Sequence, residues 1–294
     1  MTAKELYRNF LLRLQSIYAL GEATAITDRA FEAIAGIRRQ ELVKHPQQQF
    51  TAAINEELEK ALHELLQHRP VQYVLQEAWF FHLKLKVNES VLIPRPETEE
   101  LVQWLLNDLQ QVYQVRQTGT PRPAGIVNII DIGTGSGCIP IAIKKKLPAA
   151  NITAVDYSTA ALTLAKENAA SHHCDINFIE TDFLKEDNWS SLPQSDIIIS
   201  NPPYIPEQEK EQLDKNVLAW EPHLALFVPD NKALIFYEKI AAFGRKYLSP
   251  QGQIYLETHA PLAQEVANLF RKEYSAVTVK KDMFGLERFV KAVY

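Results

Sequence analysis

The stretch IVNIIDIGTGSG, residues 126–137, decides the fold of this chain. It begins as an apolar, β-branched run, which is typical of a buried strand, and turns at its glycines into a segment that favours a helix. Gly133, Gly135 and Gly137 permit a tight turn and let a ligand approach the backbone, where a Cβ atom would obstruct it. Thr134 and Ser136 lie between these glycines, in a Gly-x-Gly-x-Gly spacing that differs from the dinucleotide pattern Gly-x-Gly-x-x-Gly. This order predicts an α/β domain with a ligand site at the glycine loop.

Two further strand ends follow the glycine loop, and each one presents an acidic residue. An apolar strand at residues 152–155 ends in Asp156, about 20 residues past the loop, where folds of this kind place an acid that binds ribose hydroxyls. Asp156 also fits the start of the next helix, as its cap. A third strand at residues 176–179 is followed by Asp182 and Phe183. Phe183 either offers a stacking surface to a ligand or belongs to the core, where phenylalanine is commonly buried.

The sequence Asn201-Pro202-Pro203-Tyr204 ends a fourth strand, which the apolar run at residues 196–200 predicts. Proline fixes its own φ and lacks an N–H, so the two prolines turn the chain out of the sheet and leave carbonyl groups free to accept hydrogen bonds. The Asn201 side-chain carbonyl and a backbone carbonyl can together hold an NH2 group. The four residues also fit a proline-rich turn that closes a strand. Taken in order, the four strand ends would line one pocket with the shape of an adenosyl group.

Residues 1–72 predict a small all-helical domain. Apolar side chains recur at helical spacing at residues 6–17 and 54–65, and Pro70 ends the second segment. The domain carries no chemical constellation, so it serves either packing and dimerisation or the recognition of a substrate. Residues 73–96 predict a linker with a β-hairpin, in which apolar and polar residues alternate from 81 to 87 and a turn falls at 88 and 89.

The linker leads through Ile93-Pro94-Arg95-Pro96-Glu97-Thr98 into the α/β domain, residues 97–294. Two prolines stiffen this segment, and Thr98 with its acidic neighbours is able to start a helix. Arg95 and Glu97 either belong to that helix start or line the wall of a site.

The remaining parts of the α/β domain complete its sheet. Glycine and prolines between Gln111 and Gly125 predict a loop before the first strand of the domain. Near the C-terminus, a strand ends in Glu257, and residues 276–279 and 288–293 can close the sheet as an antiparallel pair.

Composition limits where the protein can work and what kinds of partner it can bind. Its 294 residues carry a formal net charge of −5 at pH 7, which gives no general attraction to a phosphate backbone, so no stable nucleic-acid complex is expected. Cys138 and Cys174 provide neither a disulfide framework nor a metal-binding spacing. A signal-peptide core and an apolar run of about 18 residues are both absent from the sequence. We expect a cytoplasmic monomer without a metal and without a membrane segment.

These residues resemble a known family. The chain is similar to the class I S-adenosylmethionine-dependent methyltransferases and, more narrowly, to the HemK/PrmC family, which methylates the N5 amide of the glutamine in the Gly-Gly-Gln motif of peptide chain release factors. The resemblance covers nearly the whole chain, including the helical domain and the motifs at residues 69–73, 93–98, 131–137, 201–204 and 221–222. Asn-Pro-Pro-Tyr alone is shared with DNA adenine and other amine or amide methyltransferases, whereas its combination with Ile-Pro-Arg-Pro-Glu-Thr is much more specific. The resemblance implies a Rossmann-like seven-stranded sheet, S-adenosyl-L-methionine as the cofactor and release factors as protein partners.

The resemblance also assigns the cofactor. It places the methionine end at the loop from Gly133 to Gly137, the ribose at Asp156, and the adenine at Asp182 and Phe183. Asn201 would contact both the cofactor and the substrate amide. Phe183 stands where relatives can have tryptophan, a change that preserves a stacking face.

The implied catalytic residues are Asn201, Pro202 and Tyr204. The Asn201 side-chain carbonyl and the Pro202 main-chain carbonyl would accept both N–H bonds of the amide, and the Tyr204 ring would pack on the substrate group. Substrate binding would involve these three residues together with Pro203, Arg95 and Glu97. Glu257-Thr258-His259 replaces a turn that contains more glycine in relatives, which leaves the role of Glu257 open.

Two other functions use the same motifs. A DNA adenine methyltransferase would apply the tetrapeptide to a flipped base, but it would carry a basic face that the net charge of −5 does not indicate. A catalytically silent adaptor of the same fold would have lost the glycine loop or Asn201, and both are intact.

Overall fold

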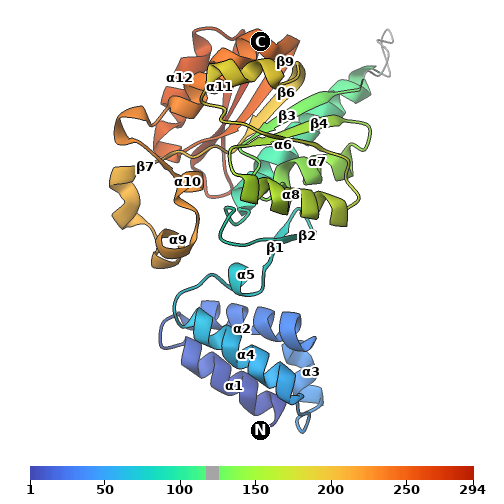
Figure 1. Ribbon diagram of the computed structural model, residues 1–294, viewed down its shortest axis with the longest axis vertical. Coiled ribbons are helices and arrows are strands. Elements are labelled where there is room, and N and C mark those ends of the chain that lie inside the picture. Colours follow the sequence, from blue (N-terminus) through green and yellow to red (C-terminus); the bar gives the residue numbers. More distant parts are fainter. Residues whose placement is uncertain (117–125) are drawn as a thin grey trace. The chain divides into compact units, whose positions relative to one another are not determined.

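The computed structural model describes residues 1–116 and 126–294. These residues divide into two compact units, Met1–Glu77 with Leu213–Trp220, and Ala78–Gln212 with Glu221–Tyr294 (Figure 1). The return of residues 213–220 to the N-terminal unit has no signal in the sequence. None of the helices in the described ranges has the length and the apolar character needed to cross a membrane.

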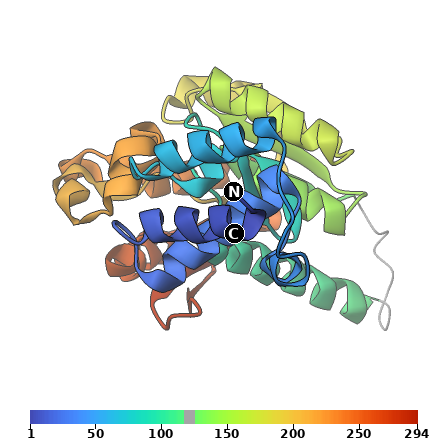
Figure 2. The same ribbon diagram turned by 90° about the horizontal axis from the view of Figure 1, so that it is seen from below.

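The first unit is helical, and its helices α1 to α4 are blue in Figure 2. It contains α1 (Ala3–Leu14), α2 (Leu20–Ala35), α3 (Arg39–Lys44), α4 (Ala52–Leu65), α5 (Val71–Val74) and α9 (Lys215–Trp220). The two predicted apolar segments correspond to α1 and α4, and their buried leucines pack with Phe31 of α2 in one core. Gly36 ends α2 with a φ of 65°, a left-handed conformation that glycine adopts without strain. The Arg69 guanidinium lies 5.5 Å from the centroid of the Trp220 ring, which holds α9 in this unit.

A hairpin is present in the predicted linker, but its first strand and its turn precede the predicted ones, and residues 91–93, predicted as its second strand, form no strand. Strands β1 (Glu77–Phe80) and β2 (Leu83–Lys86) pair with each other, and the turn between them is at Phe81 and His82 instead of residues 88 and 89. Phe81 and His82 have φ values of 52° and 63°, which neither residue type signals in a sequence. The Glu99 carboxylate accepts a hydrogen bond from Phe81 N at 2.8 Å, so a contact distant in sequence holds this turn.

Helix α6 (Pro96–Arg116) is longer at both ends than the sequence suggests. Pro96 occupies its first position, where proline fits because an N–H there has no helical partner. Thr98 therefore lies in the first turn and does not cap the helix. The predicted loop is wrong for residues 111–116, which continue the helix, and its remainder at 117–125 lies outside the described residues.

A seven-stranded sheet forms the centre of the second unit, which confirms the predicted sheet. Its order is β10-β11-β9-β6-β3-β4-β5. The strands are β3 (Asn128–Ile132), β4 (Asn151–Asp156), β5 (Asn177–Glu180), β6 (Ser195–Ser200), β9 (Leu248–Glu257), β10 (Ala276–Lys281) and β11 (Glu287–Val293). Strands β3, β4, β5, β6 and β9 are parallel, and β11 runs antiparallel to both β9 and β10, as predicted. A small parallel pair, β7 (Ile205–Pro206) and β8 (Phe227–Val228), lies apart from this sheet.

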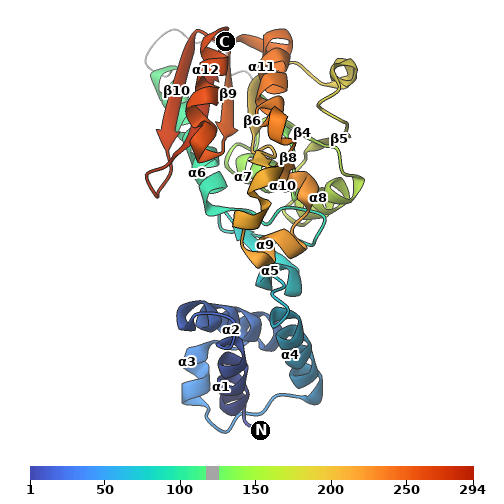
Figure 3. The same cartoon turned by 90° about the vertical axis from the view of Figure 1, so that its left-hand side faces the viewer.

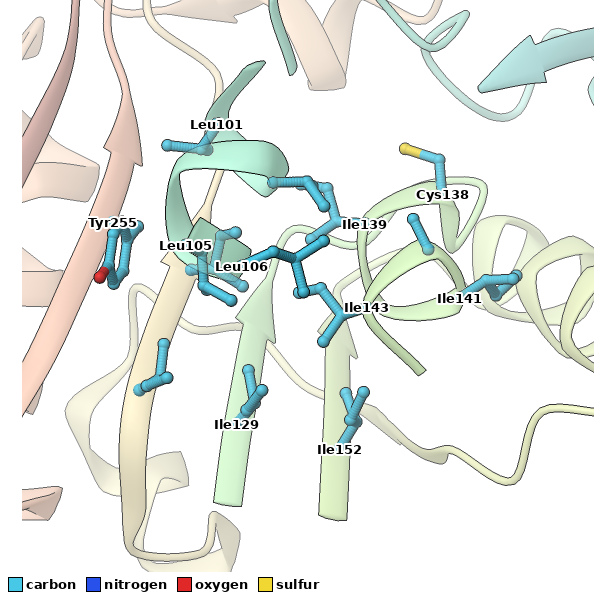
Figure 4. Close-up of a cluster of buried hydrophobic side chains, with 14 of the residues drawn as sticks. Leu101, Leu105, Leu106, Ile129, Cys138, Ile139, Ile141, Ile143, Ile152 and Tyr255 are labelled. Atoms are coloured by element: carbon cyan, nitrogen blue, oxygen red, sulfur yellow. The ribbon is translucent and has the colours of Figure 1, made fainter. Parts of the chain in front are cut away.

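Helices cover both faces of the sheet. They are α6, α7 (Cys138–Lys146), α8 (Thr159–Ser171), α11 (Ile235–Tyr247) and α12 (Ala263–Arg271), whereas the short α10 (His223–Leu226) lies beside β8. Successive side chains of a strand point to opposite faces, so Ile197 and Ile199 of β6 join the core with α6 and α7, and Ile198 joins the core with α11 and α12. Figure 3 shows the helices α11 and α12 beside the sheet, and Figure 4 shows Leu105 of α6, Ile139 of α7 and Ile129 of β3 in the first of these cores. Burial on both faces explains the continuous apolar runs in the sequence. A ligand can then reach the sheet only at the strand ends.

The carboxyl ends of β3 and β6 define the place for a ligand. The chain passes from β3 to β4 and β5 on one side of the sheet and returns to β6 on the other side, so the strand order reverses between β3 and β6. Ligands of open α/β sheets bind outside the strand ends at such a point. Ser200 at the end of β6 donates a hydrogen bond from its hydroxyl to Ile132 O at 2.6 Å, which ties the two ends together.

Asn168, fully buried on α8, joins the hairpin to the glycine loop. Its Nδ2 donates to Lys86 O and to Ser136 O, both at 2.9 Å, and its Oδ1 accepts from Lys86 N at 2.7 Å. Both the oxygen and the nitrogen of the Asn168 amide are thus hydrogen-bonded, and they connect Lys86 with Ser136, which lie 50 residues apart in sequence.

Candidate active site

A pocket of about 510 Å³ lies at the strand ends of β3, β4, β5 and β6. All of its lining residues belong to the second unit. Of the residues predicted for the site, the lining includes Arg95, Gly133, Thr134, Gly135, Ser136, Asp156, Asp182, Phe183, Asn201 and Pro203. The predicted residues Glu97, Gly137, Pro202 and Tyr204 do not line it. The sequence thus brings most of the predicted set to one place.

The three glycines of the loop serve two purposes. Gly133 and Gly135 have φ values of 78° and 53°, and a Cβ atom on either one would meet no atom within 4 Å, so their backbone faces open space. Gly137 has a φ of 79°, and a Cβ there would come within 3.2 Å of Ala165 Cβ on α8. Gly137 therefore allows the close packing of α7 on α8, while the other two leave room for a ligand.

Asp156 holds the glycine loop in place. Its Oδ2 accepts a hydrogen bond from Gly135 N at 2.8 Å, and its Oδ1 accepts from Ser158 N at 2.9 Å. The cap of α8 is Ser158, whose side chain accepts from Ala161 N, so Asp156 is not the helix cap. Burial raises the pKa of Asp156, although the backbone N–H groups oppose the shift. Each carboxylate oxygen keeps a lone pair for a ligand in the pocket.

Three side chains at this loop have buried polar atoms that lack a partner. Both Asp131 carboxylate oxygens and the hydroxyls of Thr134 and Ser136 receive no hydrogen bond from the described residues. A buried polar group without a partner destabilises a protein by about 1–3 kcal/mol. Burial raises the pKa of Asp131 to about 7, the nearby Thr134 hydroxyl opposes this shift, and the Asp156 charge supports it. Asp131 was not among the predicted site residues, although its place at the end of β3, just before the glycines, was a signal in the sequence.

Cys138 follows the loop at the start of α7. Burial raises the pKa of its thiol to about 12, and the neighbouring Asp131 charge adds to the shift. A thiol that stays protonated at neutral pH is a poor nucleophile. Cys138 therefore lines the pocket as an apolar group.

The end of β5 contributes Asp182 and Phe183. The Phe183 ring belongs to the core, with its centroid 5.5 Å from that of Trp189 and 5.4 Å from that of Phe243, yet the residue also lines the pocket. The core interpretation of Phe183 is therefore confirmed, and its use as a stacking surface for a ligand stays a prediction. The Asp182 carboxylate accepts from Leu184 N at 3.1 Å, which shapes the turn that follows the strand.

Asn201 faces the pocket with one end of its amide held by the protein. Its Nδ2 donates to Thr98 Oγ1 at 3.0 Å, and the Thr98 hydroxyl donates to Glu257 Oε2 at 2.7 Å. Among the described residues, no group donates a hydrogen bond to Asn201 Oδ1. The sequence offered no indication of this chain of bonds, because Thr98 is 103 residues from Asn201 and 159 from Glu257.

Tyr204 does not line the pocket and contacts Glu257. Its hydroxyl donates to Glu257 Oε1 at 3.4 Å, and its ring stacks on His259 with the centroids 5.8 Å apart. Burial raises the pKa of Tyr204 well above its ordinary value. Burial also raises the pKa of Glu257 to about 7, against opposing contributions from the Thr98 hydroxyl and Arg288. Glu257 thus joins the ends of β6 and β9 to α6.

The segment before α6 is fixed by Glu221. Arg95 Nη2 lies 2.5 Å from Glu221 Oε1, and Ile93 N donates to Glu221 Oε2 at 3.3 Å. Glu221 is almost fully buried, whereas the Arg95 side chain is partly exposed and lines the pocket. Glu97 lies in the first turn of α6, and Pro202 is buried. In the described ranges no group of three or more His, Cys, Asp or Glu residues is placed to hold a metal ion.

Comparisons with known proteins agree with this arrangement. Residues 5–75 match the family model "PrmC N-terminal domain", and residues 121–220 match "Methyltransferase small domain". A release factor glutamine methyltransferase from Flavobacterium psychrophilum is 39% identical over 292 residues, which cover 99% of each chain. A protein with the same name from Bacteroides thetaiotaomicron is 35% identical over 280 residues, which cover 95% of each chain.

One solved structure shows the same fold. The hMettl16 catalytic domain in complex with MAT2A 3'UTR hairpin 6 is 15% identical, has a TM-score of 0.52, and is matched over 83% of this chain and 82% of that one. Together with the match to a methyltransferase domain, this similarity confirms the predicted class I methyltransferase fold.

Proposed function

This chain belongs to the release factor glutamine methyltransferases, and we propose that it methylates the side-chain amide nitrogen, N5, of the glutamine in the Gly-Gly-Gln motif of peptide chain release factors. The methyl donor is S-adenosyl-L-methionine. The observation that carries this proposal is Asn201, whose amide oxygen is left without a donor at the wall of a pocket built for such a cofactor. An amide oxygen in that position can accept a hydrogen bond from the NH2 group of the substrate glutamine.

The unpartnered polar atoms of the glycine loop fit S-adenosyl-L-methionine. The Asp131 carboxylate would pair with its ammonium group, and the hydroxyls of Thr134 and Ser136 would donate to its carboxylate. Asp156 would accept hydrogen bonds from the ribose, and Phe183 would flank the adenine. When bound, S-adenosyl-L-methionine supplies a methyl group on a positively charged sulfur, which makes the methyl group electrophilic.

Asn201 and Pro202 would prepare the acceptor. An amide nitrogen is a poor nucleophile because its lone pair is delocalised into the carbonyl, so positioning contributes much of the rate. Asn201 Oδ1 and the Pro202 main-chain carbonyl would accept the two N–H bonds of the glutamine and direct the nitrogen lone pair into the pocket. The same two oxygens would stabilise the positive charge that grows on the nitrogen.

No strong base is required at this site. A methylated amide nitrogen that carries a positive charge loses its proton readily to water. Tyr204 and Glu257, which are linked to Asn201 through Thr98, are already engaged, because the Tyr204 hydroxyl donates to Glu257 and Glu257 also accepts from Thr98. Tyr204 would then act through its ring and its contact with Glu257, and proton abstraction is not its role.

The helical unit would recognise the protein substrate away from the glutamine. It contributes no residue to the pocket, and the match to the PrmC N-terminal domain over residues 5–75 supports a function of its own in this family. The formal charge of −5 favours a protein partner over a nucleic acid. We place this reaction in the cytoplasm, where release factors act, and assign it to a monomer.

A direct assay tests the proposed function. Purified protein is incubated with labelled S-adenosyl-L-methionine and an intact release factor, beside a Gly-Gly-Ala variant of that factor and duplex DNA. Label should enter the intact factor alone. Equal labelling of the Gly-Gly-Ala variant would move the reaction to another residue, and labelling of the DNA would favour the adenine methyltransferase.

A further inference from the structure

We propose that Thr98 and Glu257 are positioning residues, which fix the direction in which the Asn201 side-chain amide faces. This inference rests on the proposed function and names what prepares Asn201 for it. The two ends of an asparagine amide are similar in shape, but one accepts hydrogen bonds and the other donates them. Only the oxygen can receive a substrate N–H, so a half-turn of the amide would abolish the interaction.

The order of donors along the chain of bonds determines the direction. An ionised carboxylate only accepts, so the single proton of the Thr98 hydroxyl points to Glu257 Oε2, at 2.7 Å. Thr98 Oγ1 can then only accept from Asn201, and the amide must turn its Nδ2 to the 3.0 Å contact. Asn201 Oδ1 is thereby directed away from Thr98.

Burial stabilises this direction as long as Glu257 is ionised. Thr98 and Glu257 are 3% and 2% exposed, so water does not compete for their hydrogen bonds and the low local dielectric strengthens them. Glu257 is held at further points, since the Tyr204 hydroxyl donates to its Oε1 and the Tyr237 hydroxyl donates to its main-chain oxygen at 3.2 Å. A fixed acceptor leaves the amide one favourable orientation.

A structural role for the same bonds makes different predictions. If Thr98 and Glu257 served only to join α6 to β9, their loss would lower thermal stability and the affinity for cofactor together. If they position Asn201, their loss lowers kcat and leaves KM for the release factor and the affinity for S-adenosylhomocysteine nearly constant.

The kinetic test uses Thr98→Val, which removes the hydroxyl and keeps the shape. We expect kcat to fall by about 10- to 100-fold, the effect of leaving one buried polar group without its partner. Thr98→Ser restores a hydroxyl and should recover most of that loss. Thr153→Val is the matched control, because Thr153 is a buried threonine of β4 that does not line the pocket.

The role of Glu257 is tested by asking whether its effect on kcat depends on Thr98. Glu257→Met removes the acceptor and should lower kcat by a similar factor. The double variant Thr98→Val/Glu257→Met should be no slower than either single variant, because residues that act in series do not add their effects. Additive losses would show that the two residues act separately and would overturn the proposal.

A measurement without substrate separates this inference from the proposed function. In protein labelled with ¹⁵N-asparagine, the Asn201 side-chain signals are identified by their loss in Asn201→Ala. Their protons should exchange slowly with water in the wild type and in Thr98→Ser, and rapidly in Thr98→Val. Unchanged exchange in Thr98→Val overturns the inference. Slow exchange in a wild type that fails to methylate release factors overturns the proposed function alone.

Discussion

The two halves of the pocket differ in how their polar groups are satisfied. At the glycine loop, Asp131, Thr134 and Ser136 have buried polar atoms that form no hydrogen bond with the described residues. At the end of β6, the Asn201 nitrogen is bound to Thr98, which is bound in turn to Glu257. We call the glycine loop, with its unpaired polar atoms, the open half of the site. The closed half is Asn201 with Thr98 and Glu257, whose polar groups are hydrogen-bonded to one another.

This difference matches two different tasks. A cofactor with charged groups can itself supply the missing partners, so the open half gains binding free energy when it is filled. An uncharged amide offers little binding energy and must be oriented, so the closed half fixes its acceptor beforehand. Changes in the closed half should therefore alter the chemical rate, and changes in the open half should alter cofactor affinity.

The largest effect is expected from Asn201→Ala. Removing the amide oxygen should slow methyl transfer in a single turnover by about 10²–10³, as for the loss of one oriented polar group in a transition state. The affinities for S-adenosylhomocysteine and for the release factor should change little. Asn107→Ala, on the exposed side of α6, is the control. A variant that keeps its full chemical rate would make residues 201–204 a structural turn.

In the open half, Asp156→Ala should weaken cofactor binding. It removes the acceptor of Gly135 N and the proposed ribose contact, and a lost partner of a buried polar group corresponds to roughly 1–3 kcal/mol. Calorimetric titration should show S-adenosylhomocysteine bound about 5- to 150-fold more weakly. Gly135→Val should act in the same direction, because it places a side chain in a left-handed conformation at the open face of the loop. Normal affinity in both variants would remove the cofactor from this loop.

Glu257 makes the closed half sensitive to pH. Burial raises its pKa to about 7, the Thr98 hydroxyl and the Arg288 charge oppose that shift, the Glu97 charge supports it, and the Tyr204 hydroxyl opposes it through its hydrogen bond. A protonated Glu257 can donate to Thr98 Oγ1, which frees the threonine proton for the wrong end of the amide.

We therefore expect kcat to rise with pH as Glu257 ionises, by up to about tenfold between pH 6 and pH 8. In Glu257→Gln this dependence should vanish, since glutamine does not titrate. His259 also titrates near this site, and burial lowers its pKa. The control His259→Gln should keep the wild-type midpoint. A midpoint that moves in His259→Gln and persists in Glu257→Gln would assign the effect to the histidine.

The smallest effect concerns Asp131 in the open half. Its pKa of about 7 lies above the ordinary 3.8, so its contribution to stability is present below about pH 4 and is lost as pH rises through 7. Asp131→Asn cannot ionise and should escape that loss. Without ligand, the melting temperature of the variant relative to the wild type should be higher at pH 8 than at pH 5, by roughly 2–4 °C for each kcal/mol.

The same variant should bind S-adenosylhomocysteine more weakly, because the ammonium group loses its charged partner. Stability and binding would then change in opposite directions at one residue. A variant that binds normally and melts like the wild type at both pH values would show that Asp131 has a partner in solution.

Most of the open half could be predicted from the sequence, except Asp131, whereas the contacts that hold the closed half could not. Gly133, Asp156 and Asp182 lie at or just after the ends of apolar strands, and parallel strands bring their carboxyl ends to one edge, so local pattern is enough to gather them. Asn201 was found in the same way. Thr98 and Glu257 reach Asn201 from α6 and β9, and no local pattern reports contacts across 103 or 159 residues.

The errors in the fold have the same origin. The hairpin turn at Phe81 and His82 depends on Glu99, and Thr98 reads as a cap until Pro96 is seen to start the helix. Gly137 shows the opposite case, because a glycine that looked like part of the ligand loop is required by the contact with Ala165. Tertiary contacts therefore decided the hairpin turn and Gly137, whereas Pro96, two residues before Thr98, decided the start of α6.

The amide of Asn168 has a consequence for the exchange of parts between relatives. It binds Lys86 in the hairpin and Ser136 in the glycine loop at the same time, so the hairpin is inherited with the cofactor loop. A chimera should be joined near residue 77, where the helical unit ends, because a junction after the hairpin would separate Asn168 from its two hydrogen bonds to Lys86. The transplant must also carry residues 213–220, which group with the helical unit. Domain shuffling in this family would then move two separate pieces of sequence at once.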